Sequence, residues 1–161
     1  MAACDKLKKL LDEQKIKYVM HTHSKAYTSQ EIAATMHVSG NVLAKSVMVK
    51  SNGNLSMVVL PANYKINFDD LKKALGDKDL QLASEKNFKP LFKECETGAM
   101  CPFGNLYDVP VFIAKSIADK DEIAFNAGTH TDAISMPMGN YMNLVQPRIL
   151  KISEPIWPKR L

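Results

Sequence analysis

One lysine of this sequence occupies a position where a charged side chain is unexpected. Residues 43–50 are rich in β-branched and other apolar side chains, which is typical of a strand. Successive side chains of a strand alternate between its two faces, so Lys45 shares a face with Leu43 and Val47. An ammonium group on an apolar face is costly unless it reaches an anion or a cavity. Lys45 is therefore a candidate functional residue, although a small shift of the strand start would place it on the outer face.

A second candidate is the loop sequence Gly98-Ala-Met-Cys-Pro-Phe-Gly104. Its glycines and proline favour a defined loop conformation. Such loops can present backbone N–H groups to an anion or an oxyanion, but an ordinary connecting loop can have the same composition. Cys101 within the loop could be a nucleophile. Nothing in the sequence lowers its pKa, so we expect a buried or bystander thiol.

The third candidate is the segment Asn126-Ala-Gly-Thr-His-Thr-Asp132, in which a predicted strand ends and a glycine turns the chain. His130 could act as a base, orient a water molecule or bind a 2′-hydroxyl. An equally open interpretation is a histidine whose ring is satisfied within its own turn, for example by Asp132.

Two further histidines, His21 and His23, have the spacing that puts both rings on one face of a strand. They could form half of a metal site. No CxxC, HExxH or acidic ligand cluster accompanies them, so we expect no metal. The chain also lacks GxGxxG and GxxxxGK[ST], and we expect no nucleotide cofactor of those classes and no other cofactor.

The elements that position these residues follow from caps, apolar periodicity and turn signals. Asn52-Gly53 predicts a hairpin, and Asn67 and Gly76 have the residue types that begin and end a helix. Helices are predicted at 5–16, after the capping box 28–31, at 67–75, after Ser84 and at 140–145, and strands at 18–21, 43–50, 55–60, 80–83, 111–114, 123–126, 131–135 and 148–152. The short connections favour an α+β fold with a mixed, mostly antiparallel sheet flanked by helices.

Length and composition set the outer limits. The chain has 161 residues and a net charge of +4, which fits one globular domain, expected over residues 1–152 with a loosely held tail at 153–161. The charge permits an anionic partner such as RNA but is too small to argue for one. No apolar run approaches the ~18 residues of a membrane span, and the N-terminus lacks the pattern of a secretory signal. Three cysteines without a CxxC pair fit reduced thiols in the cytoplasm.

In their order along the chain, the three candidate segments resemble motifs of the YbaK/ProX family of aminoacyl-tRNA deacylases, which is similar to the editing insertion of bacterial prolyl-tRNA synthetases. Ala44-Lys45-Ser46 is similar to the AKS/AKT strand of the family, Gly98–Gly104 to its GxxxPxG loop, and Asn126–His130 to its NAGTH turn. The resemblance covers residues 5–152. It implies a mixed, partly closed sheet flanked by helices, which agrees with the elements predicted above.

The resemblance implies a hydrolase that cleaves the ester of a mischarged aminoacyl-tRNA, with tRNA-Pro carrying a small amino acid such as alanine or cysteine as the expected substrate. It assigns catalytic roles to Lys45, which would hold a phosphate or the ester carbonyl, and to His130, which would orient water or a ribose hydroxyl. The substrate-binding residues that it implies are His21, Tyr27, Ser46, Gly98, Pro102, Phe103, Gly104, Asn126, Gly128 and Thr129.

Two departures from the family pattern leave the amino acid open. Some alanine-specific members carry Asn where this chain has Ser46, and Ala114-Lys115 replaces an expected acidic pair. The alternatives to an editing hydrolase are a non-catalytic tRNA- or synthetase-binding module with a degenerate pocket, and a small metal-independent esterase that needs no tRNA. The presence of Lys45, Gly98 and His130 together favours the hydrolase. Mischarged tRNA is the expected partner, with a synthetase or an elongation factor as the protein that delivers it; no membrane partner is expected, and the oligomeric state is not predicted.

Overall fold

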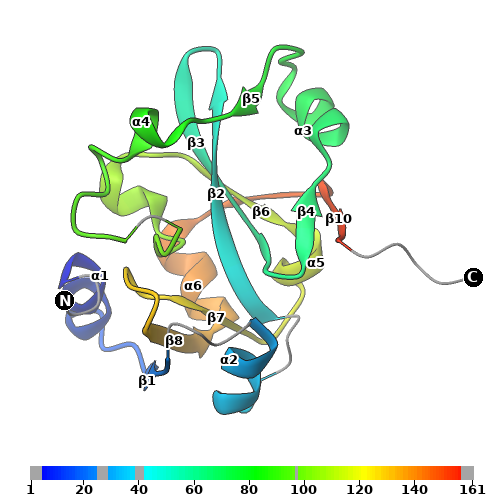
Figure 1. Ribbon diagram of the computed structural model, residues 1–161. Helices are drawn as coiled ribbons and strands as arrows, with labels where there is room; N and C mark the ends of the chain where they lie inside the picture. The colour runs from blue at the N-terminus through cyan, green and yellow to red at the C-terminus, as the bar shows by residue number, and fades with distance from the viewer. Residues whose placement is uncertain (1–4, 25–28, 39–41, 97, 157–161) are drawn as a thin grey trace, which may run out of the picture.

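The structure, a computed structural model, describes residues 5–24, 29–38, 42–96 and 98–156 (Figure 1). Its helices are α1 (Asp5–Glu13), α2 (Ser29–Thr35), α3 (Phe68–Leu75), α4 (Glu85–Phe88), α5 (Lys115–Ala118) and α6 (Met138–Val145), with a 3₁₀ helix at Gly104–Tyr107. Its strands are β1 (Val19–Thr22), β2 (Leu43–Ser51), β3 (Asn54–Pro61), β4 (Tyr64–Ile66), β5 (Gln81–Leu82), β6 (Val111–Ala114), β7 (Glu122–Asn126), β8 (Asp132–Pro137), β9 (Arg148–Leu150) and β10 (Ser153–Pro155). Among these described residues, no helix is both long enough and apolar enough to span a membrane.

Eight of the described strands form one mixed sheet in the order β1-β8-β7-β2-β3-β6-β9, with β5 added to the far end of β2, while β4 and β10 form a separate two-stranded sheet. The hairpin pairs are antiparallel, whereas β2 runs parallel to β7, β3 to β6 and β6 to β9. Strand β2 is the long central strand in Figure 1. The predicted α+β class and mixed, largely antiparallel sheet are confirmed.

The β2–β3 hairpin has the tight turn that its sequence predicts. Strand pairing runs without interruption from Ala44 opposite Pro61 to Ser51 opposite Asn54. Asn52 and Gly53 have φ of 52° and 81°, the left-handed conformation that both central residues of a type I′ turn require. This turn fixes the register and therefore fixes which face of β2 carries Lys45.

Helix α3 begins and ends at the predicted residues. The side chain of Asn67 accepts a hydrogen bond from the Asp70 N–H, and Gly76 follows the last turn with φ of 66°. Helix α1 is shorter than predicted. It ends at Glu13 because Lys15 adopts a left-handed conformation, and the Ile16 N–H then bonds to the Leu11 carbonyl.

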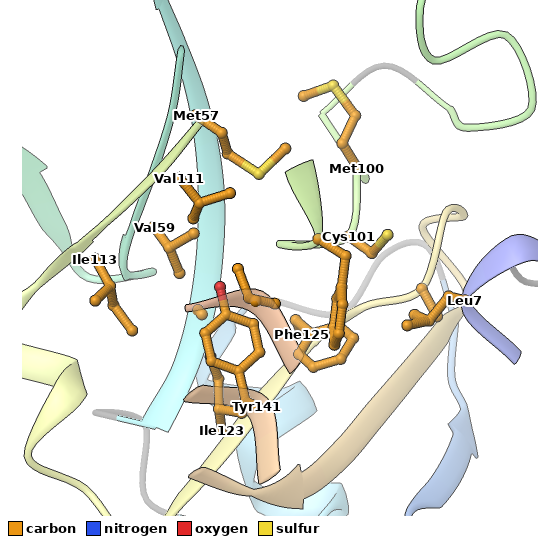
Figure 2. Close-up of a cluster of buried hydrophobic side chains, with 14 of the residues drawn as sticks. Leu7, Met57, Val59, Met100, Cys101, Val111, Ile113, Ile123, Phe125 and Tyr141 are labelled. Carbon is orange, nitrogen blue, oxygen red and sulfur yellow. The ribbon is translucent and has the colours of Figure 1, made fainter. Parts of the chain in front are cut away.

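Helices cover both faces of the sheet. On one face, α1 and α6 bury their apolar side chains in the largest core, which contains Leu7, Phe103, Phe125 and Tyr141 (Figure 2). On the other face, α3 packs over the middle strands and α2 packs over the ends of β2, β7 and β8. The even-numbered Ala44 and Met48 of β2 face the first core, so the odd-numbered positions face α2 and α3.

The chain differs from the predicted elements mainly at its C-terminal end. Residues from 153 onward were expected to be a loosely held tail. Instead, Ser153–Pro155 pairs with Tyr64–Ile66 as a separate two-stranded sheet, and the Ser116 and Ser153 hydroxyls lie 2.8 Å apart. The short strand β4, helix α5 and the 3₁₀ helix were not predicted either. Each has four residues or fewer, which is too short to show apolar periodicity.

Candidate functional site

Strand β2 is paired on one side along its whole length and on the other side only at its ends. Toward β7, its partners are Ala124 opposite Leu43 and Phe125 opposite Ala44. Toward β5, pairing begins again only at Val49. Just before that pair, the Ala83 N–H donates to the Met48 carbonyl at 3.0 Å. Within the described chain, residues 45–47 therefore have no strand partner on this side. We call residues 45–47 the β2 gap, and the candidate residues Lys45 and Ser46 belong to it.

Lys45 is the first residue of the β2 gap, on the same face as Val47, and its side chain is half-buried. It lines an open groove of about 390 Å³ with Val47, Leu60, Lys65, Ile66, Phe68 and Leu82. Loss of hydration by burial lowers the pKa of the Lys45 ammonium. Among the residues that the structure describes, no carboxylate forms an ion pair with it. The strand register predicted from the sequence thus places a cation in an apolar groove.

The strand register also aligns three candidate residues across the sheet. His21 lies opposite Ala133, and Ala133 lies opposite Asn126. Continuing the β2–β7 register by one residue brings Asn126 to the level of Lys45. Because neighbours across a sheet point to the same face, these side chains form a row on the face that α2 covers.

Two oxygen atoms at the β2 gap are buried without a hydrogen-bond partner among the described residues. They are the hydroxyl of Ser46, which points to the opposite face from Lys45, and the side-chain carbonyl of Asn126. Buried polar atoms are nearly always paired in folded proteins, so unpaired ones call for a ligand, a water molecule or a functional reason. Here they border both faces of the same opening in the sheet.

Hydrogen bonds connect the loop around Gly98 to the turn that carries His130. The Glu96 N–H donates to the Gly128 carbonyl at 2.8 Å, and the Gly128 N–H donates to the Ala99 carbonyl at 2.9 Å. The Glu96 carboxylate accepts the backbone N–H of His130 at 2.6 Å. The two motifs, about 30 residues apart in the sequence, therefore form one unit next to the β2 gap.

Gly98 is the position where this unit needs a glycine. Its φ is 84°, and a Cβ atom there would lie 3.5 Å from Cε1 of His130. A side chain would therefore be strained by the backbone conformation and would touch the imidazole ring. The structure brings the predicted residues Gly98 and His130 into contact range.

The turn itself is held by hydroxyl and carboxylate groups. Thr129 Oγ1 donates to Asp132 at 2.9 Å and accepts the Asp132 N–H at 3.0 Å, while Thr22 Oγ1 donates to the other carboxylate oxygen at 3.3 Å. Thr129 is buried. We infer that Thr129 and Asp132 fix the shape of the turn.

The second half of the glycine-rich loop packs against the core. Phe103 is fully buried against Phe125 and Tyr141, and the Tyr141 hydroxyl donates to the Pro102 carbonyl at 2.7 Å. Burial strongly raises the pKa of Tyr141, so this hydroxyl stays protonated. At Gly104 a Cβ atom would lie 2.7 Å from the Val109 carbonyl oxygen. These residues anchor the loop in the core.

Cys101, in the middle of the loop, is also fully buried in that core (Figure 2). A thiol without access to solvent has the environment of a packed side chain, as the sequence predicted. Lys115, the other unusual residue, is exposed and lies 3.7 Å from Asp119, one turn further along the chain. It takes no part in the arrangement around the β2 gap.

Two remaining predictions concern residues near β1. Tyr27 lies outside the described residues. His23 is buried, with Nδ1 at 3.0 Å from the Ser24 carbonyl, whereas His21 belongs to the row described above. In the described part of the chain, no three His, Cys, Asp or Glu side chains gather closely enough to hold a metal ion.

The sequence alone did not point to Glu96 or to the groove residues Lys65 and Phe68. Their places depend on contacts between segments that are distant in sequence, such as Glu96 with His130. The acidic residue directly before the glycine-rich segment was visible in the sequence, but its partner was not.

Comparisons with known proteins show which protein family and which fold this chain resembles. The family described as "Aminoacyl-tRNA editing domain" matches residues 23–144, which is most of the chain. The proline–tRNA ligase of Thermosipho melanesiensis is 31% identical over 109 residues, which cover 68% of this chain and 18% of that protein. The proline–tRNA ligase of Bacillus mycoides is 25% identical over 89 residues, covering 55% and 16%. The chain thus spans less than a fifth of these curated relatives.

Solved structures share the fold at low sequence identity. A protein proposed to be a trans-editing enzyme for prolyl tRNA synthetase superposes with a TM-score of 0.80 at 14% identity, over 92% of this chain and 95% of that one. The hypothetical protein APE2540 superposes with a TM-score of 0.80 at 17% identity, over 93% of this chain and all of the other.

Proposed function

Because the chain belongs to the family of aminoacyl-tRNA editing domains, we propose that it is a hydrolase that cleaves the ester bond of mischarged aminoacyl-tRNA. The observation that supports this proposal most is the β2 gap. It combines a half-buried ammonium without an ion-pair partner among the described residues with two buried, unpartnered oxygen atoms. A substrate that carries phosphate, an ester carbonyl and hydrogen-bond donors would satisfy all three groups.

The reaction adds one water molecule across the ester. The water oxygen attacks the carbonyl carbon, and the carbonyl oxygen gains negative charge in the tetrahedral intermediate. The bond to the ribose oxygen then breaks, and that oxygen takes up a proton. Free amino acid and deacylated tRNA are the products. Such esters are already labile, so positioning of the water and stabilisation of the oxyanion supply the catalysis.

The proposed roles follow from position. Lys45 brings positive charge to the substrate's phosphate or ester carbonyl. His130, held through its backbone by Glu96, orients the water or a ribose hydroxyl. Asn126 and Ser46 offer oxygen atoms to hydrogen-bond donors of the substrate. Gly98 leaves room beside the imidazole ring.

We propose tRNA-Pro carrying a small amino acid, such as alanine or cysteine, as the substrate. The curated relatives are proline–tRNA ligases, which supports tRNA-Pro and also a synthetase as the partner protein. A synthetase pocket that accepts its own amino acid discriminates poorly against a smaller one, by about 1–3 kcal/mol per methylene group. A second, separate hydrolytic site then removes the wrong product.

The test is deacylation of labelled tRNA-Pro carrying alanine, cysteine, serine or proline, with Lys45→Ala and the exposed control Lys86→Ala beside the unaltered protein. We expect selective hydrolysis of one mischarged species, a roughly 100-fold loss of kcat/KM in Lys45→Ala, and no change in Lys86→Ala.

Two other outcomes would contradict the proposal. If the tRNA binds but no ester is hydrolysed faster than it decays spontaneously, the chain is a binding module. If a simple amino-acid ethyl ester is hydrolysed as fast as the charged tRNA, the chain is an esterase that needs no tRNA.

A further inference from the structure

The groove beside Lys45 extends well beyond the residues assigned to the reaction. Its floor and walls are apolar side chains of β2, β3, β4 and the start of α3, including Val47, Leu60 and Phe68. Leu82 of β5 stands on its rim and is 60% exposed, which is unusual for a large apolar side chain. The volume, about 390 Å³, lies within the range of small-molecule sites.

Both of the charged side chains that line this groove are lysines. Besides Lys45, the groove contains Lys65 of β4. Lys65 lies 4.0 Å from Glu154, and both side chains are about half exposed. An exposed ion pair at this distance is weak, so it can be exchanged for a stronger anion. Two ammonium groups over an apolar floor suit a ligand with flat apolar faces and spaced negative charges, as single-stranded nucleic acid has.

The geometry of the sheet gives the direction in which an RNA strand would leave the β2 gap. On the face of Lys45, the side toward β7 and β8 is filled by α2, whose Ile32 and Met36 pack on Leu43 and Ala124. The side toward β4 and α3 is the open groove. Among the described residues, the groove is therefore the path along this face that is open to a substrate whose ester lies at the gap.

We propose that this groove binds the nucleotide that precedes the terminal adenosine of the tRNA acceptor end, with its base on Phe68 and Leu82 and its phosphate at Lys65. This inference rests on the proposed function, since it takes the ester to lie at the β2 gap. Two ammonium groups match two successive phosphates. Lys45, which belongs to the gap, binds the phosphate of the terminal nucleotide. Lys65 and the apolar rim then bind the preceding nucleotide.

The test compares two substrates that carry the same amino acid. One is the mischarged tRNA, and the other is the aminoacyl ester of adenosine alone, which lacks the preceding nucleotide. The variants are Lys65→Gln and Leu82→Asn, both at exposed positions, and the matched controls are Lys86→Gln and Leu91→Asn. If one groove variant fails to fold, the other is sufficient for the comparison.

We expect each groove variant to raise KM for the tRNA about tenfold with kcat unchanged, because base stacking and phosphate contacts act on binding. Hydrolysis of the adenosine ester should be unchanged, and both controls should behave as the unaltered protein. Equal losses on both substrates, or no loss on either, would overturn the groove assignment.

A binding measurement separates failure of this inference from failure of the proposed function. The probe is a labelled CCA trinucleotide, followed by fluorescence anisotropy. If the protein hydrolyses no ester but binds the trinucleotide through Lys65 and Leu82, the groove assignment stands and the hydrolase is wrong. If it hydrolyses the mischarged tRNA while both variants bind the trinucleotide as well as the unaltered chain does, the hydrolase stands and the groove assignment is wrong.

Discussion

Lys45 forms no ion pair with any carboxylate in the part of the chain that the structure describes. Holding an ammonium group among Val47, Leu60 and Phe68 costs free energy, which lowers its pKa. Catalytic and binding groups commonly carry such a cost, because the group is complementary to the ligand and not to the folded protein alone.

We predict that Lys45→Met stabilises the protein while removing its activity. Removal of the half-buried charge should raise the free energy of unfolding at pH 7 by about 1 kcal/mol, measured by urea denaturation. The gain should shrink toward pH 10. Between the lowered pKa in the folded state and the ordinary value of 10.5, the unfolded chain binds more protons, so the unaltered protein gains stability as pH rises.

Lys86→Met, on the exposed side of α4, is the control for the general effect of losing a positive charge. A Lys45→Met protein that is less stable than the unaltered one at pH 7, or whose advantage grows with pH, would contradict the prediction.

At the level of single residues, the sequence predicted the strand face of Lys45 better than the surroundings of the loop residues. Strand alternation was enough to place Lys45 on the face of Val47. It could not separate Gly98, which faces His130, from Phe103, which is buried in the core five residues later. Nor could it find Glu96, because its contact with the His130 backbone depends on how two distant loops meet.

At the level of the elements, the Asp77 carboxylate connects the β2–β3 hairpin to the end of α3 by hydrogen bonds. Asp77 is buried just after α3 and accepts hydrogen bonds from the Ser51 hydroxyl at 2.9 Å and from the N–H groups of Asn52 and Asp79 at 3.0 Å each. The hydrogen bonds from Asp79 and Ser51 hold the pKa of Asp77 below its ordinary value, against the opposing effect of burial. One side chain thereby connects the hairpin turn to the end of the helix whose first residue, Phe68, lines the groove.

We predict that Asp77→Asn lowers stability at neutral pH and flattens its dependence on acid. A carboxyl group whose pKa is depressed in the folded state stabilises the protein above its ordinary pKa of 3.8, and this contribution is lost as pH falls through the lower folded value. Thermal melting between pH 7 and pH 2.5 should therefore show a smaller acid-induced fall in Tm for the variant. The exposed Asp79→Asn is the matched control; identical acid profiles for Asp77→Asn and the unaltered protein would disprove the role of Asp77.

The ends of α3 and the turn of the β2–β3 hairpin, which have capping or turn chemistry, were predicted to the residue, whereas the β4–β10 pair was not predicted. Asn67 and Gly76 bound α3 as expected, and Asn52-Gly53 forms the hairpin turn. The pairing of β4 with β10 left no such signal, because each strand has three residues and its partner is almost 90 positions away. Only the folded chain brings them together.

For the molecule as a whole, the β4–β10 pair closes the groove side of the domain. The Asn67 N–H donates to the Ile152 carbonyl at 2.7 Å, and the Ile156 N–H donates to the Asn63 carbonyl at 3.1 Å, so the segment after β9 is bonded on both sides of β10. Strand β4 also carries Lys65. The last part of the described chain therefore holds one wall of the proposed RNA groove.

We predict that a chain ending at Ile152 is less stable by at least about 1 kcal/mol and binds the CCA trinucleotide more weakly. The truncation removes the backbone pairing with β4 and the contact between the Ser116 and Ser153 hydroxyls. Chemical denaturation and fluorescence anisotropy measure the two effects. A chain ending at Ile156 keeps β10 and should match the unaltered protein; if both truncations behave alike, β10 has no such role.

The β2 gap has a consequence for how such a domain can change its substrate. In most sheets, altering the backbone of an interior strand disturbs the hydrogen bonds on both of its sides. Here residues 45–47 are paired only with β3 in the described chain, so a small shift or an exchanged side chain at Ser46 leaves the β7 and β5 ladders intact. Selection could therefore change Ser46, whose buried hydroxyl has no partner among the described residues, at little cost in folding, and one scaffold could give rise to editors of different amino acids.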